Sequence, residues 1–332
     1  MKQEPKNVAT KQRWYAWMAI SVVILMIAGV SYWAFCKALH AETTVRYTGL
    51  QRLVAAQLNK TITAMEMSAT NVFNAVEKHM DTPEAVVHAL EEEANLNPDV
   101  RGYFAAFEPY FFPEKGHWYE PYVHQNDSSM FEVSMVGSAR HDYTQSQWYK
   151  HAKDIKMSFW SDPYYYYDGT SISGHYCTFV KPIFTEDGKL ACVCGADITF
   201  EWLTKALHKI DDGYRHELLV TTPQLARDFN FFSMVVDHDG ACIVHPDSIT
   251  TSFTDPDVLR DFEQQRPGVV EMEVAGVPSL VYYGPIDGID WSVAVVAQKA
   301  DVQKPFNYVG WLLLVVSVIA IVAVWFLCKR IG

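Results

Sequence analysis

Two long apolar runs without a charged residue lie near the two ends of the sequence, and they constrain every fold the chain can adopt. They extend from Trp14 to Cys36 and from Pro305 to Cys328. Each run exceeds the roughly 20 apolar residues that a helix needs to cross a bilayer. The sequence therefore predicts membrane-spanning helices at 14–36 and 305–328, which enclose a middle region of residues 37–304.

Basic residues flank both runs on the sides that face the chain ends, residues 1–13 and 329–332. They are Lys2, Lys6, Lys11 and Arg13 before the first run, and Lys329 and Arg330 after the second. Under the positive-inside rule both ends are predicted to be cytoplasmic, which places the middle region outside the cytoplasm. A cleaved signal peptide is the alternative for the first run, but the bulky Tyr32, Trp33 and Phe35 leave no small-residue cleavage site.

Aromatic residues at the ends of both runs predict contact with membrane lipid at the two interfaces. They include Trp14, Trp17 and Trp33 on the first run, and Tyr308 and Trp325 on the second. The chain carries 39 acidic and 27 basic residues, and part of its basic charge lies outside the middle region. The middle region is therefore strongly acidic, so nucleic acid is not predicted as a partner.

Four cysteines lie in the middle region, where disulfides are permitted. The Asp187-Gly188 pair predicts a two-residue hairpin turn, with Cys192 opposite Ile183 and Cys194 opposite Lys181. In that register Cys177 lies beyond disulfide reach, so reduced and partly buried thiols are expected. A zinc site formed by the cysteines and His175 is the alternative, although their spacing is not a ligand signature, and no cofactor is predicted.

Apolar residues at steps of three and four predict a stalk helix over residues 37–81. They are Val54, Leu58, Ile62, Met65, Ala69, Val72, Val76 and Met80. This stripe can pack on the helix's own domain or form the seam of a dimer, and its period does not separate the two. Thr82-Pro83 predicts the start of a second helix that runs to about Asn95.

The pattern then becomes strand-like, which predicts an α+β lobe over residues 82–212. Its strands are expected at Tyr103–Phe107, Met130–Val136, Phe159–Trp160, Tyr176–Phe184 and Ala191–Thr199, and its helices at Gln147–Ile155 and Phe200–Ile210. A smaller lobe nearer the membrane is predicted over residues 213–304. Its strands are expected at Phe232–Asp237, Cys242–His245, Gly268–Val274, Ser279–Tyr283 and Trp291–Gln298.

Four segments, in this order, resemble the double Cache domains of bacterial transmembrane receptors. They read WSDPYYYYDG, GADIT, VVDHDGACIVHPD and YYGPIDGIDWSVAVV. The resemblance implies two stacked PAS-like lobes on a long helix, which sense a ligand on the periplasmic or extracellular side of the bacterial inner membrane. It also implies a parallel homodimer and a cytoplasmic output module, such as a kinase, phosphatase, chemotaxis helix or cyclase, that lies beyond this chain.

The resemblance also nominates a ligand site in the distal lobe. In amino-acid-binding members an R-x-W-Y element clamps the ligand carboxylate, and here Trp148 and Tyr149 match its aromatic pair within a segment that includes Tyr143. Ser146 stands where the arginine would be, and a serine is a weak partner for a carboxylate. The standard amino-acid interpretation is therefore in doubt.

The other half of the pattern is present. Asp197 matches the aspartate that binds the ligand ammonium, Tyr164 matches an aromatic pocket residue, and Thr178 is expected opposite Asp197 on the hairpin. One carboxylate among aromatic rings suits an amine or another nitrogenous cation. The alternatives are that Asp197 only caps the helix at Phe200, and that Trp148 and Tyr149 are core residues.

The sequence thus predicts the ligand-sensing half of a receptor with two membrane spans, and not an enzyme. It contains no Gly-rich phosphate loop, no G-x-S-x-G element and no H-x-x-x-H pair. One rival is a membrane-anchored adaptor that binds a protein partner, which a complete chain with so short a cytoplasmic end would favour. A divalent-cation sensor that uses the acidic surface is the other.

Overall fold

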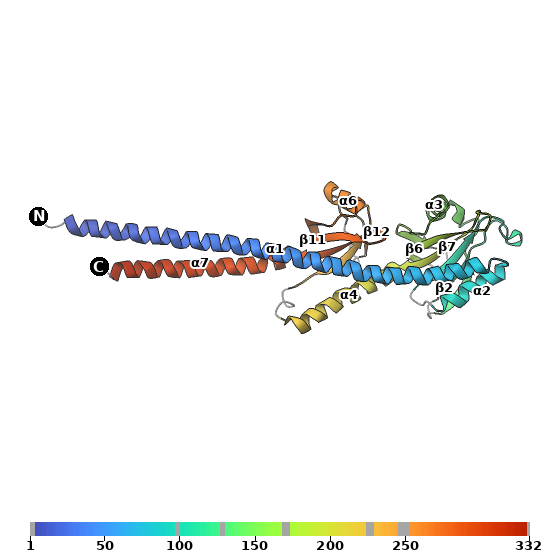
Figure 1. Ribbon diagram of the computed structural model, residues 1–332, viewed down its shortest axis with the longest axis horizontal. Helices are drawn as coiled ribbons and strands as arrows, with labels where there is room; N and C mark the ends of the chain where they lie inside the picture. The colour runs from blue at the N-terminus through green and yellow to red at the C-terminus, as the bar shows by residue number, and fades with distance from the viewer. Residues whose placement is uncertain are drawn as a thin grey trace.

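The structure is a computed structural model that describes residues 4–96, 100–126, 130–167, 173–223, 229–244 and 252–330. Figure 1 shows an elongated molecule in which both termini lie at one end and two lobes follow one another along a single long helix. Helices α1 (Glu4–Lys78) and α7 (Lys299–Arg330) run side by side at the end that carries the termini. Both are long and apolar enough to cross a membrane.

Helix α1 joins the predicted membrane span and the predicted stalk without a break. It contains 75 residues, about 110 Å at 1.5 Å per residue. The predicted apolar stripe is confirmed, since its residues from Val54 to Val76 are buried and Met80 packs against the same core. The helix ends at Lys78, earlier than the predicted residue 81. Helix α2 (Pro83–Ala94) begins where predicted, because the Thr82 side chain accepts a hydrogen bond from Ala85 N.

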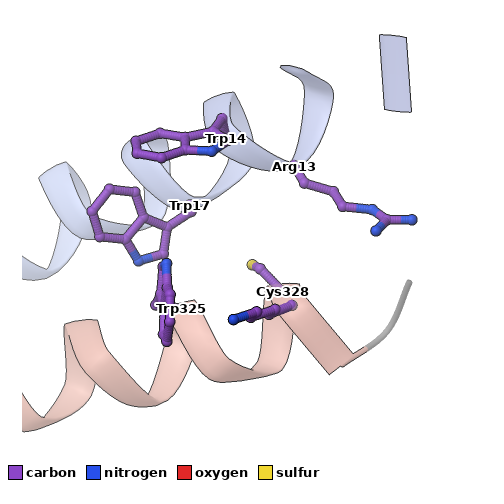
Figure 2. A pocket seen from close by; sticks show the side chains of 6 residues that line it. Arg13, Trp14, Trp17, Trp325 and Cys328 are labelled. Atoms are coloured by element: carbon purple, nitrogen blue, oxygen red, sulfur yellow. The ribbon is translucent and has the colours of Figure 1, made fainter. Parts of the chain in front are cut away.

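The ends of α1 and α7 near the termini enclose a pocket lined by aromatic and basic side chains. Figure 2 shows Trp14 and Trp17 on α1 facing Trp325 on α7. Trp17 Nε1 donates to the backbone oxygen of Ile321 at 3.2 Å, and Lys329 Nζ lies 4.8 Å from the centre of the Trp325 ring. These contacts fix the two helices to one another at that end.

The distal lobe is built on a seven-stranded sheet of antiparallel pairs. The strands are β1 (Gly102–Phe107), β2 (Pro121–Gln125), β3 (Phe131–Met135), β4 (Phe159–Trp160), β5 (Tyr164–Tyr167), β6 (Ser173–Phe184) and β7 (Leu190–Thr199). Their order is β3-β2-β1-β7-β6-β4, and β5 also pairs with β6. Helix α3 (Gln147–Ile155) has the predicted bounds, and the short helices η1 (Pro113–Lys115) and η2 (Tyr143–Gln145) lie in the connections. The sequence did not predict β2 or β5 as strands.

The proximal lobe has a five-stranded antiparallel sheet in the order β10-β11-β12-β8-β9. Its strands are β8 (Phe232–Val236), β9 (Cys242–Val244), β10 (Gly268–Val274), β11 (Val277–Ile286) and β12 (Ile289–Gln298). His245, the predicted end of the second strand, lies outside the described residues. Helix α4 (Phe200–Thr221) runs well past the predicted residue 210, and α6 (Pro256–Glu263) was not predicted.

One apolar core joins the two lobes through α1. Tyr47 of α1 stacks between Phe229 and Tyr282, with ring centres 4.7 and 5.1 Å apart. Farther along the helix, Leu58 and Phe73 belong to the same buried cluster. The predicted α+β class, with two stacked lobes on a long helix between two apolar helices, is confirmed.

A glycine on β7 is required by the packing of the distal sheet. A Cβ at Gly195 would lie 2.1 Å from the ring of Phe104, its neighbour on β1. We expect Gly195→Ala to lower the free energy of unfolding by about 1–3 kcal/mol, because the ring must move within a packed core.

The matched control is Gly213→Ala, at an exposed position in α4 where a new Cβ meets nothing within 4 Å. It should be neutral or stabilising by up to about 1 kcal/mol, since alanine is the better helix former. Urea unfolding of the purified chain in detergent, followed by near-ultraviolet circular dichroism, measures both. Equal midpoints for the two variants would show that the Gly195–Phe104 contact is unimportant.

Candidate functional site

The β6–β7 hairpin sets the position of Asp197. The predicted register is confirmed, with Cys192 opposite Ile183 and Asp197 opposite Thr178. The predicted two-residue turn is wrong, because Thr185 N donates to Lys189 O at 2.8 Å and leaves residues 186–188 as a three-residue loop. A register shift between Ile183 and Phe184 compensates for the additional loop residue and restores the predicted pairing.

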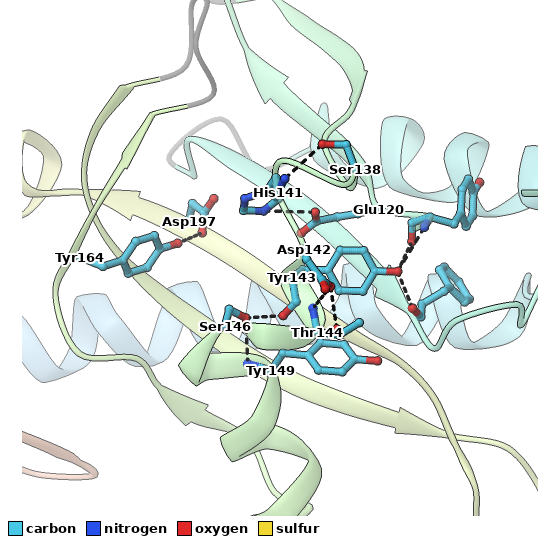
Figure 3. A network of polar contacts seen from close by, with 12 residues as sticks. Glu120, Ser138, His141, Asp142, Tyr143, Thr144, Ser146, Tyr149, Tyr164 and Asp197 are labelled. Atoms are coloured by element: carbon cyan, nitrogen blue, oxygen red, sulfur yellow. Dashed lines mark hydrogen bonds and ion pairs between the residues drawn. The ribbon is translucent and has the colours of Figure 1, made fainter. Parts of the chain in front are cut away.

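Asp197 is a buried carboxyl group held by hydroxyls. The residue is only 7% exposed. Thr178 Oγ1 donates to Asp197 Oδ1 at 2.6 Å, and Tyr164 Oη donates to the same oxygen at 3.3 Å. Tyr164 Oη and Thr178 Oγ1 lie 2.6 Å apart, so the three groups form one network. Figure 3 shows the contact between Tyr164 and Asp197.

The alternative in which Asp197 caps the helix at Phe200 is wrong. Thr199 occupies the cap, where its hydroxyl accepts a hydrogen bond from Trp202 N at 3.2 Å. Asp197 instead belongs to the strand and points from the sheet into a small cavity. Because Thr199 caps the helix, the Asp197 carboxyl group can contact a ligand in this cavity.

A second buried acid, Glu120, faces the same cavity. Its side chain is 5% exposed, and among the described residues no donor meets its Oε2 in good hydrogen-bond geometry. His141 Nε2 lies 3.4 Å from that oxygen, an ion pair only when the imidazole is protonated. Figure 3 shows His141 between Glu120 and Asp197. The sequence singled out neither Glu120 nor His141, because Glu120 directly precedes the unpredicted strand β2 and His141 lies in an irregular segment.

The inner pocket between these acids has a volume of about 40 Å³ and aromatic walls. It is lined by Phe104, Glu120, Tyr122, Val136, His141, Trp148, Tyr164, Tyr166 and Asp197. It opens toward an outer cleft of about 540 Å³, which shares four of these side chains, namely His141, Trp148, Tyr164 and Tyr166. An inner space of this size admits one group of about the size of a water molecule.

Burial governs the electrostatics of the two acids. It raises the pKa of Asp197 from 3.8 to about 6, against the hydrogen bonds from Thr178, Tyr122 and Tyr164, which lower it. Burial also raises the pKa of Glu120, which the contact with His141 counteracts. The polar contact with Glu120 in turn raises the pKa of His141. The inner pocket therefore becomes more negative as the pH rises through 6.

Comparison with known proteins identifies the fold around this pocket. Residues 86–205 match the family model for the first PDC sensor domain of methyl-accepting chemotaxis protein-like proteins. The chain also superposes on the extracellular domain of mmHK1S-Z3, a candidate histidine kinase, with a TM-score of 0.63, 19% identity, and coverage of 82% of this chain and 98% of that one. The middle region has the double Cache fold.

Two chemoreceptor domains share this double Cache fold. The periplasmic sensory domain of Tlp1 from Campylobacter jejuni superposes with a TM-score of 0.61 and 12% identity, and 80% of this chain covers 99% of that one. The ligand-binding domain of CtaA from Pseudomonas fluorescens, in complex with L-isoleucine, superposes with a TM-score of 0.55 and 16% identity. The match covers 80% of this chain and 96% of that one. Comparison with curated protein sequences gives no match.

Four of the six predicted site residues of the double Cache lobe come together. Trp148, Tyr164 and Asp197 line the inner pocket, and Thr178 lies directly behind Asp197. Trp148 also contacts Phe104 at a ring distance of 5.0 Å, so it forms a wall of the pocket as well as part of the core.

Tyr143 and Tyr149 do not line either cavity. Tyr143 Oη donates to Phe107 O at 2.6 Å, and Tyr149 Oη donates to Glu108 Oε1 at 2.9 Å, so both hydroxyls are used within the core. Their rings point away from Asp197 in Figure 3. For Tyr149, the expectation that it is a core residue fits this placement better than a ligand contact.

The predicted thiols are placed in the double Cache core. Cys177, Cys192 and Cys194 are buried and free, with the last two sulfur atoms 3.9 Å apart. Burial raises the pKa of the Cys192 thiol, which disfavours the thiolate that binds metals. Within the described ranges, no group of three or more His, Cys, Asp or Glu side chains is arranged to hold a metal ion.

The raised pKa of Asp197 predicts a pH-dependent stability. The folded state holds this proton more tightly than the unfolded chain, so the stabilisation is complete below about pH 4 and is lost as the pH rises through 6. The shift from 3.8 to about 6 corresponds to about 3 kcal/mol. Asp197→Asn removes this titration, so its free energy of unfolding relative to the parent should rise by about 2–3 kcal/mol between pH 4 and pH 8.

Asp187→Asn is the control for this pH series. Lys189 and Thr185 lower the pKa of the exposed Asp187 to about 2, so this group is ionised throughout the range. Its difference from the parent should therefore be constant from pH 4 to pH 8. Urea unfolding at each pH gives both curves, and an Asp197→Asn difference that does not change with pH would contradict the assignment.

Proposed function

We propose that the double Cache region senses a small cationic amine outside the cytoplasm, binds it in the distal lobe, and passes a conformational bias across the membrane. The observation that carries this proposal is the pair of buried acids, Asp197 and Glu120, at one aromatic-walled pocket. None of the described residues that line the inner pocket or the outer cleft is a lysine or arginine. An incoming cation would supply the charge partner that the fold itself provides only through His141.

Energetics favour a ligand ammonium at this point. A buried carboxylate is costly unless it is paired and hydrogen-bonded, and the hydroxyls of Thr178 and Tyr164 only partly compensate Asp197. An ammonium brings both a charge and three donors. Ring faces of Trp148 and Tyr122 in the same pocket can add about 0.5–2 kcal/mol each by attraction to the cation.

The nature of the ligand is inferred from what the site lacks. CtaA is seen with L-isoleucine and PctB from Pseudomonas aeruginosa with L-Gln, which supports a small molecule as the ligand of this chain as well. An amino acid also needs a partner for its carboxylate. Ser146 is committed to α3, where its hydroxyl accepts from Tyr149 N at 3.4 Å and donates to Tyr143 O at 2.6 Å. An amine without a carboxylate fits this site better.

Signalling by this route needs no catalysis. A ligand that binds one of two arrangements of the stalk helix α1 and the last span α7 more tightly shifts their populations toward that arrangement. The flanking basic residues support cytoplasmic termini, from which an output module or partner would be controlled. A parallel homodimer through α1 and contacts of the interfacial aromatics with lipid remain parts of the proposal.

The test is the thermal unfolding of the purified chain in nanodiscs with amines, amino acids, nucleobases, carboxylates and divalent cations. An amine at 100 times its dissociation constant should add about 2.7 kcal/mol of stability and raise the unfolding midpoint. Asp197→Ala should abolish that increase, because the carboxylate that pairs with the ammonium is gone.

Asp211→Asn is the matched control for the loss of a buried acid. Asp211 is also buried, but it accepts hydrogen bonds from Ser233 N and Oγ at 2.8 and 2.7 Å in the proximal lobe. Its variant should lower the starting midpoint and keep the amine-induced increase. An increase that survives in Asp197→Ala would refute this pocket, and a response to no compound class would favour a protein-binding adaptor.

A further inference from the structure

The outer cleft adjoins the inner pocket and is also lined by acidic side chains. Asp162 of the distal lobe and Asp290 of the proximal lobe both line it. Both residues are exposed, and neither carboxylate has a hydrogen bond or ion pair among the described residues. The cleft is therefore formed by both lobes, and its two carboxylates are available to a ligand.

The two cavities differ greatly in size, so they would hold different parts of one ligand. The inner pocket of about 40 Å³ has room for an ammonium group, and the outer cleft of about 540 Å³ has room for a chain and a second group. His141, Trp148, Tyr164 and Tyr166 line both, so the two cavities adjoin at these rings. The part that remains in the cleft is exposed to Asp162 and Asp290.

Charge decides which second group the cleft accepts. Its titratable lining consists of two carboxylates, two histidines (His141 and His151) and two tyrosines, and none of its described lining residues is a lysine or arginine. A carboxylate on the ligand would meet like charge, whereas a second amino group would meet opposite charge. At the inner end, His141 Nε2 at 3.4 Å is the charge partner of Glu120 Oε2 among the described residues, and that oxygen has no hydrogen bond of good geometry, so an ammonium there would supply one.

We infer that the ligand is a dication with an amino group at each end of a flexible chain. One ammonium occupies the inner pocket between Asp197 and Glu120, and the other lies in the outer cleft beside Asp162 and Asp290. This inference rests on the proposed function and adds to it the class of ligand and the contribution of the proximal lobe. The ligand then connects the two lobes directly.

Asp290 lies on the strand that leads directly into the second apolar helix, α7. Asp290 is the second residue of β12, which continues without an intervening loop into α7. Its neighbour Trp291 packs on Trp160 of the distal lobe, with ring centres 5.9 Å apart, and Trp160 Nε1 donates to Glu66 Oε1 of α1 at 2.6 Å. A cation held by Asp290 therefore acts at the junction of both lobes with both membrane helices.

Three probes of matched length test this inference on the full chain in nanodiscs, by calorimetric titration. They are 1,4-diaminobutane, butylamine and 4-aminobutyrate, which differ only in the group at one end. We expect the diamine to bind about three- to tenfold more tightly than the monoamine, as for an exposed charge pair, and the aminobutyrate to bind most weakly. Asp290→Asn and Asp162→Asn should reduce the affinity for the diamine toward that for butylamine and leave butylamine unchanged.

The control is Asp287→Asn, an exposed acid in the β11–β12 connection that does not line the cleft, which should change neither affinity. Equal affinities of the parent for diamine and monoamine, both lost in Asp197→Asn, would overturn the dication and leave the proposed function standing. Equal losses for both probes in Asp290→Asn would also overturn it. Binding of no probe, or binding insensitive to Asp197→Asn, would overturn both the inference and the proposed function.

Discussion

The packing of both sheets on one continuous helix is the constraint on which the rest of the structure depends. The buried face of α1 contributes to a single apolar core that reaches from Tyr47, between Phe229 and Tyr282, to Phe73 in the distal lobe. Neither lobe can rotate about the helix without exposing part of this face to water. The lobes are therefore held in a fixed relation to one another, and the cleft to which both contribute has defined walls.

The same helix shows why so much of the fold can be predicted from sequence. A stripe such as Leu58, Ile62 and Met65 repeats the helical period over many turns, so a local irregularity does not hide it. Short buried elements lack this redundancy. Strand β2 begins at Pro121 and is buried at four of its five positions, so it has no alternation to detect. Helix α4 continues past Gly213, where Tyr214 and Leu218 pack against the buried core, a tertiary contact that helix propensity does not include.

The candidate site was predictable to the extent that it lies on the hairpin. Asp197 and Thr178 were placed opposite one another by strand pairing alone, and Tyr164 by its resemblance to known members. Glu120 and His141 reach the pocket from a missed strand and an irregular segment, and nothing in their local sequence distinguishes them. Tyr143 and Tyr149 lie near the site in sequence, but the pattern could not show that their hydroxyls are used by Phe107 and Glu108.

The uninterrupted course of α1 also has a mechanical consequence. A helix of 75 residues is about 110 Å long, and the described part contains no break between the distal lobe and the end near the termini. It behaves as a lever, so that a tilt of about one degree at the distal lobe displaces the far end by about 2 Å. Under the proposed function, rearrangements in the pocket smaller than the width of an atom would become displacements comparable to those that separate the states of packed helices in known switches.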